Sequence, residues 1–136
     1  MASASRLDKR KLEQMIRSQP SKTDAWLRGV ALTMEGNIKQ SMLDSPASGA
    51  TYSRGEGRTH TASSPGNAPR PDMGALINSI RMEKVGRLHY EIRDGVEYGI
   101  ALEDGTTRIA ARPFMRPEFE RQRLNLANDA KKHLFS

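Results

Sequence analysis

The sequence contains no cysteine, few aromatic residues and no long hydrophobic run. Without cysteine the chain has no disulfides, no thiol catalysis and no zinc–thiolate site. No nonpolar stretch approaches the ~20 residues that a membrane-spanning helix needs, and residues 1–6 lack the nonpolar core of a secretory signal. These absences predict a protein made in the cytoplasm, and used there or released by lysis, with no membrane partner.

The chain length of 136 residues fits a single domain, 1–136. Only 36% of the residues are hydrophobic and 5% aromatic, so part of the chain is expected to lie outside a packed core. The 22 Lys and Arg residues exceed the 16 Asp and Glu residues, which gives a net charge of +6. Such a balance favours contact with nucleic acid or acidic protein surfaces, and it is equally typical of a solvated basic surface.

Residues 7–43 form the helical region. A first helix is predicted over 7–18, where nonpolar residues share one face among Lys and Arg, with Pro20 as its end. A second helix is predicted over about 22–43, after polar residues suited to capping its start. Every fourth position is nonpolar: Trp26, Val30, Met34, Ile38 and Met42. This stripe indicates a core face or a subunit interface.

Residues 44–71 are dominated by Ser, Gly, Pro, Ala and Thr. A loop this long is unusual in a compact domain, so we expect it to be extended or mobile, or to be ordered by a neighbour. Its contact candidates are Tyr52, Arg54 and Arg58. His60 could bind a metal, but no cluster of other ligands supports this, and a solvated loop histidine is the favoured interpretation.

Residues 72–136 are predicted to hold a sheet and a C-terminal helix. After a short helix or turn, strands are expected over 80–85, 87–93 and 96–102, because Gly86 and the pair Asp94-Gly95 are turn signals. Alternation in the second of these strands places His89 on the face away from Leu88, Tyr90 and Ile92.

The last helix is predicted over about 114–135, with Pro113 and Pro117 at its start. Its buried face is expected to comprise Leu124, Ala127, Ala130 and Leu134. The fold class is therefore α+β. N-terminal helices and the C-terminal helix would pack on one face of a small antiparallel sheet of three or four strands, with a long Gly/Ser/Pro loop.

Several residues between the loop and the last helix suggest structural roles. Gly74 and Gly105 are expected to supply backbone angles, or a close approach of neighbouring atoms, that a Cβ atom would forbid. Glu103 and Thr106 can accept hydrogen bonds from backbone donors and so fix the exit from the sheet.

The entry to the last helix suggests roles of the same kind. Phe114 is expected to plug the core where this helix meets the sheet. Arg112 and Arg116 could reach Glu103, Asp104 or a neighbouring subunit. The alternative is that all of these residues serve the fold alone.

Three motifs occur in a fixed order. They are Asp72-Met73-Gly74-Ala75-Leu76-Ile77-Asn78-Ser79-Ile80, then Tyr98-Gly99 with Glu103-Asp104-Gly105-Thr106, then Pro113-Phe114-Met115-Arg116-Pro117. Together they resemble the tail-completion or head–tail joining (neck) protein family of long-tailed phages, to which the lambda minor tail protein Z belongs. Met73 stands where the family often has Thr, so a hydroxyl cap is not expected there.

The resemblance implies a structural virion protein, located in the tail or neck, that forms a ring at the head–tail junction and joins tail to head. It implies a homo-oligomer, with a hexamer expected and a dodecamer as the alternative. Other neck and tail proteins, such as a tail terminator or a head-completion protein, would be its partners. It implies no catalytic residue, no metal and no cofactor. The candidate interface or structural residues are Tyr52, Arg54, Arg58, Gly74, Leu76, Tyr98, Glu103, Gly105, Thr106, Arg112, Pro113, Phe114 and Arg116.

Two other functions compete with this interpretation. An enzyme is disfavoured because the sequence lacks a nucleophile motif and a phosphate-binding glycine loop, and Glu97, Glu103 and Asp104 have no evident base beside them. A basic DNA-binding protein, acting on or around packaged viral DNA, is permitted by the net charge and the cationic N-terminal segment. No helix-turn-helix or zinc finger supports it.

Overall fold

The computed structural model describes residues 8–47, 49, 51–53, 57–63, 65–69, 74–96, 98–107 and 110–135, without the side chains of Tyr52 and Ser53. Within these residues the helices are α1 (Lys9–Ser18), α2 (Pro20–Leu43), α3 (Ala75–Ser79), α4 (Tyr98–Asp104) and α5 (Arg116–His133). The strands are β1 (Thr51–Ser53), β2 (Thr59–Thr61), β3 (Arg81–Gly86) and β4 (His89–Arg93). The mixture of helices and short antiparallel strands confirms an α+β fold.

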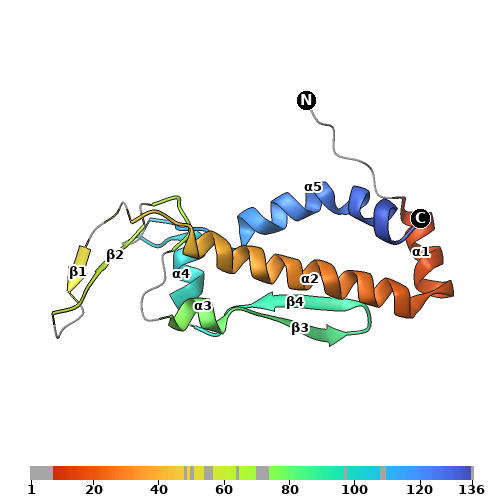
Figure 1. Ribbon diagram of the computed structural model, residues 1–136, viewed down its shortest axis with the longest axis horizontal. Helices are drawn as coiled ribbons and strands as arrows, with labels where there is room; N and C mark the ends of the chain where they lie inside the picture. The colour runs from red at the N-terminus through yellow and green to blue at the C-terminus, as the bar shows by residue number, and fades with distance from the viewer. Residues whose placement is uncertain are drawn as a thin grey trace, which may run out of the picture.

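Helix α2 is the central element of the molecule (Figure 1). Helix α5 runs antiparallel along one side of α2, and the β3–β4 hairpin lies along another side. Helices α3 and α4 lie near the C-terminal end of α2, whereas α1 lies at the opposite end. None of the helices in the described ranges is both long enough and nonpolar enough to cross a membrane.

The first two helices meet at Gln19, whose φ of −139° and ψ of 64° are not helical. Pro20 is the first residue of α2, where a missing N–H costs no hydrogen bond. Helix α2 therefore begins earlier than the capping pattern around residues 21–24 indicated. Helix α1 is capped by Asp8, whose Oδ1 accepts hydrogen bonds from the N–H groups of Arg10 and Lys11 at 3.1 and 3.3 Å.

The predicted stripe on α2 supplies the core. Its last three members, Met34, Ile38 and Met42, are buried. They pack with nonpolar residues from four other segments: Leu76, Ile80, Ile92 and Phe114. Phe114 is only 2% exposed, which confirms its predicted position as a core plug.

Trp26, the first member of the same stripe, is half-buried and links α2 to α5. Its Nε1–H donates a hydrogen bond of 2.8 Å to Asp129 Oδ2. On α5 the small residues Ala127 and Ala130 and the larger Leu134 are buried, as predicted. Leu124 was predicted to be buried as well, but it is 56% exposed. Leu124 lies on a different part of the helix surface from the two buried alanines.

The β3–β4 hairpin confirms two of the predicted strands. Tyr90 and Ile92 alternate with the exposed His89, as the period of two required. The connecting turn includes Leu88, which has a φ of 52°.

The predicted third strand over 96–102 is wrong, because this segment holds α4 instead. In the helix, Gly99 and Leu102 fall on the same inward side, while Tyr98 and Ile100 are exposed. A Cβ atom at Gly99 would lie 2.5 Å from Asp94 Oδ1, so the close approach of α4 to the end of β4 requires glycine. The described strands therefore form two separate two-stranded sheets and not one sheet of three or four strands.

Candidate assembly site

A β-hairpin projects from the body at the end of α2 (Figure 1). Strands β1 and β2 pair antiparallel, with Thr51 opposite Thr61 and their hydroxyl oxygens 2.9 Å apart. We call this β1–β2 hairpin the arm. It lies within the segment 44–71, so part of that predicted loop is extended. No described residue of the two strands belongs to the buried core.

The arm is held where it leaves the body. The N–H of Gly49 donates to the carbonyl of Ala62 at 2.8 Å, and Arg112 Nε donates to the carbonyl of Ser63 at 3.2 Å. A Cβ atom at Gly49 would lie 2.3 Å from the Ser63 oxygen, so only glycine fits there. We call Gly49, Ala62, Ser63 and Arg112 the arm base. Arg112, predicted to reach an acidic residue or another subunit, instead binds the backbone of the arm base.

Glu103 connects α4 to the start of α5. Its carboxylate accepts hydrogen bonds from the N–H groups of Phe114, Met115 and Arg116 at 3.1, 2.8 and 3.0 Å. The helix-capping position Met115 makes no side-chain cap itself. A carboxylate here satisfies donors that have no partner within the helix and also complements the positive end of the helix dipole. The predicted backbone binding by Glu103 is confirmed, but its donors belong to the helix entry and not to the turn.

Two neighbouring features support this connection. Arg116 Nη2 lies 2.8 Å from Asp104 Oδ1, which confirms one of the predicted ion pairs. Both side chains are more than half exposed, so solvent weakens the attraction. Gly105 ends α4 with a φ of 76°, the left-handed conformation expected for this glycine. Thr106 is exposed beside it.

The remaining predicted residues are spread over the molecule. Gly74 has the expected positive φ, 80°, and precedes α3, in which Leu76 is buried. Pro113 is half-buried in the entry to α5. Tyr98 is 49% exposed on α4.

Three more predicted residues come from the arm segment. Arg58 is exposed between the two arm strands, and for Tyr52 only the backbone in β1 is described. Arg54 lies outside the described residues. The structure therefore gathers Glu103, Phe114 and Arg116 at the entry to α5 and leaves Tyr98 and the arm residues apart.

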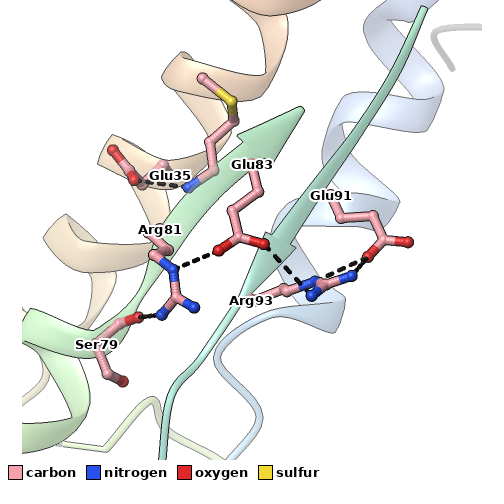
Figure 2. A network of polar contacts seen from close by, with 7 residues as sticks. Glu35, Ser79, Arg81, Glu83, Glu91 and Arg93 are labelled. Atoms are coloured by element: carbon pink, nitrogen blue, oxygen red, sulfur yellow. Dashed lines mark hydrogen bonds and ion pairs between the residues drawn. The ribbon is translucent and has the colours of Figure 1, made fainter. Parts of the chain in front are cut away.

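The solvent-facing side of the β3–β4 hairpin carries a network of charges (Figure 2). Arg81 Nε lies 2.6 Å from Glu83 Oε1, and Arg93 lies between Glu83 and Glu91 at 3.3 and 2.7 Å. Glu83 stands directly opposite Glu91 in the register, an unfavourable like-charge pair that the diagonal arginine offsets. The hydrogen bond from Arg81 lowers the pKa of Glu83, and the hydrogen bond to Glu91 raises the pKa of Arg93.

The opposite side of the hairpin is attached to α2 by a polar triad. The Tyr90 hydroxyl donates to Asp24 Oδ2 at 2.9 Å, and Lys84 Nζ lies 3.1 Å from Asp24 Oδ1. The Tyr90 hydrogen bond and then the Lys84 contact hold the pKa of Asp24 below its usual range. Burial raises the pKa of Tyr90, so its hydroxyl stays a donor.

Sequence reasoning missed two carboxylates that join elements. Glu118 is only 8% exposed, and it accepts hydrogen bonds from Asn37 on α2 and from Arg121 and Gln122 on α5. Glu35 on α2 accepts a hydrogen bond of 2.8 Å from the N–H of Met82 on β3. Glu118 could have been found from the sequence, because it is an acidic residue in the first turn of a predicted helix. No pattern in the sequence links Glu35 to β3.

The carboxylates described above all have partners within the fold. Among the described residues, no three His, Asp or Glu side chains gather in an arrangement suited to a metal ion. The named carboxylates are occupied by backbone N–H groups, arginines, an amide, a tyrosine or a lysine. Such an arrangement connects elements of the fold.

No protein-family model, curated protein or solved structure matches this chain. The resemblance to neck proteins therefore rests on the three motifs alone.

Glu103→Ala should lower the free energy of unfolding by about 1–2 kcal/mol, because it leaves the first N–H groups of α5 without an anionic acceptor. Urea denaturation at neutral pH measures this change. Asp104→Ala is the matched control, since it removes only an exposed ion pair and should cost at most about 0.5 kcal/mol. Equal losses for the two variants would contradict the role assigned to Glu103.

Acid should destabilise the protein partly through Asp24. A carboxyl whose pKa is lower in the folded than in the unfolded state stabilises the fold above the unfolded pKa. This stabilisation is lost as the pH falls below about 5 and through the folded pKa. Asp24→Asn should therefore show a smaller loss of stability between neutral and acidic pH than the wild type, measured by urea midpoints. Glu13→Gln on the exposed face of α1 controls for the loss of one surface carboxylate, and a slope unchanged in Asp24→Asn would refute the assignment.

Proposed function

We propose that this chain is a structural virion subunit of the tail-completion or neck type, which forms a ring at the head–tail junction and joins the tail to the head. The observation that carries the proposal is the arm, which projects from the body on a braced base while its strands bury none of the described core. A hairpin held in this way, without a hydrophobic core of its own, is suited to contact with a neighbour.

The motifs behind the family resemblance support the proposal physically. Glu103 and the entry to α5 lie next in the chain to Arg112, which binds the arm base. Arg112 directly precedes the Pro113–Pro117 motif, so the motif lies next in the chain to a residue that holds the arm base. On this proposal the chain is a single domain that acts through shape and contacts, without a catalytic residue, metal or cofactor.

The proposed location is the neck or tail of the virion, after synthesis in the host cytoplasm. The expected assembly is a homohexamer, with a dodecamer as the alternative for a head-side position. The partners would be other neck and tail proteins, with viral DNA as a further contact inside the ring.

Removal of the arm should leave the chain folded but prevent its assembly into a ring. Replacing residues 51–61 by Asn-Gly keeps the Gly49–Ala62 hydrogen bond within a tight turn. We expect the urea midpoint to stay close to that of the wild type, because no described residue of the arm belongs to the core. Native mass measurement should show that the ring is lost, and particles assembled with the variant should lack joined tails. Normal infectious particles from this variant would refute the proposal.

A second candidate function is DNA binding, and the charge distribution favours it. Helix α1 carries the exposed cations Lys9, Arg10, Lys11 and Arg17, and the last turn of α5 carries Lys131 and Lys132. The ammonium of Lys11 lies 6.0 Å from the centre of the Phe135 ring, so the two cationic groups are neighbours. They lie at the end of the molecule opposite the arm (Figure 1).

If this cationic end binds duplex DNA, the affinity should fall steeply with salt, because each neutralised phosphate releases counterions. Fluorescence anisotropy over a series of salt concentrations measures the slope. The double variant Lys9→Glu/Arg10→Glu should weaken the binding and flatten the slope. No measurable binding by the wild type, together with a ring-shaped particle, would leave only the structural function.

A further inference from the structure

The two edges of the β3–β4 hairpin are not equivalent. At the β3 edge, the carboxylate of Glu35 accepts the hydrogen bond of the Met82 N–H at 2.8 Å (Figure 2). In an antiparallel pair, an N–H that bonds outside the ladder belongs to a residue whose backbone groups point away from the partner strand. The Glu35 carboxylate therefore closes this part of the β3 edge against another strand.

The outer edge of β4 follows from the same register. Met82 is opposite Ile92, and Lys84 is opposite Tyr90. Residues that face each other share the type of pair, so the backbone groups of Tyr90 and Ile92 also point away from the ladder. In the part of the chain that the structure describes, β4 pairs with β3 alone. The β4 edge is thus open for a further strand.

A groove of about 360 Å³ lies beside this open edge. It is lined mainly by nonpolar side chains of three elements, among them Leu27 and Val30 of α2, Tyr90 and Ile92 of β4, and Phe119 and Leu126 of α5. Phe119 is 45% exposed, and because it adjoins the other nonpolar side chains of the groove it adds to one continuous surface that a partner can bury. The groove thus offers backbone groups on one side and nonpolar surface on the other, the combination by which a sheet edge binds an added strand.

We propose that this groove receives the arm of a second copy of the chain, with an arm strand added to β4. The inference rests on the proposed function and deepens it by naming the two surfaces that meet. The arm supplies a two-stranded sheet, β1 paired with β2, and it is rich in the β-branched residues Thr51, Thr59 and Thr61. Within one molecule the arm points away from the groove, beyond α3 and α4 (Figure 1), so the groove must be filled by another copy.

The contact joins two different surfaces, so it is heterologous. Repeated head-to-tail contact of this kind closes into a ring when the rotation between neighbours permits, and otherwise continues as a filament. The two edges of the β3–β4 hairpin fit a head-to-tail contact. Glu35 closes the β3 edge, so an incoming strand can add only to β4.

Cross-linking tests the contact directly, because the natural chain contains no cysteine. Assembled particles containing a mixture of Thr59→Cys chains and Phe119→Cys chains are treated with a bismaleimide. We expect cross-linked dimers of the two chains at a yield severalfold above that from Thr59→Cys mixed with Val85→Cys. Val85 is the matched control, since it is an exposed nonpolar residue, 39% exposed, on the strand whose edge is closed.

A second measurement uses two exposed nonpolar residues on one helix. Phe119 lines the groove, whereas Leu124, which is 56% exposed, does not. Phe119→Lys should weaken self-association about tenfold or more, because it places a charge in the nonpolar contact, while Leu124→Lys should change it about twofold or less. Both variants should keep the wild-type urea midpoint.

The outcomes separate this inference from the proposed function. A ring that forms normally but gives equal cross-linking to Phe119→Cys and Val85→Cys, or equal effects of the two lysine variants, overturns the arm–groove contact and leaves the structural function standing. Cross-linking of Phe119→Cys to a segment other than the arm also overturns the arm–groove contact. A wild-type chain that remains monomeric at every concentration, and is absent from particles, overturns both.

Discussion

The burial of one face of α2 is the interaction on which the other elements depend. A two-stranded hairpin is marginally stable by itself in water, and short helices such as α3 and α4 are weaker still. Ile38 and Met42 of α2 are completely buried, and they pack in one cluster with Ile92 of the hairpin, Leu76 of α3 and Phe114 before α5. Each of these segments gains its stability from nonpolar surface that α2 supplies.

Carboxylates connect the elements around this core. Glu103 binds the start of α5, Glu118 joins α5 to α2, Glu35 holds the edge of β3, and Asp24 holds Tyr90. In a chain with fewer acidic than basic residues, these acidic groups serve internal connections. The net charge of +6 follows from the composition, and the carboxylates used in these connections are less available to pair with basic side chains on the surface.

The arm and the groove are two places where the described structure leaves strands or nonpolar surface uncovered within one molecule. The arm has paired strands but no described core, and the groove has a nonpolar lining beside an open strand edge. Exposed strand edges are usually protected, as Glu35 protects β3. The open β4 edge has no such protection in the described structure, and it is the surface that we propose for assembly.

Periodicity in the sequence determined α1, α2, α5 and β4, because their nonpolar residues repeat with the period of each structure, and the turn signal at Gly86 indicated β3. It also determined the positive φ angles of Gly74 and Gly105 and the burial of Phe114. Residues 96–102 alternate as a strand would, yet Tyr98–Asp104 form a helix in which Gly99 lies close to Asp94. Only the tertiary structure decided that this segment is a helix, and only the tertiary structure decided which N–H groups donate to Glu103. Both depend on which distant segments of the chain meet. A local pattern records the period of an element, whereas the partner of a side chain depends on how the elements pack around α2.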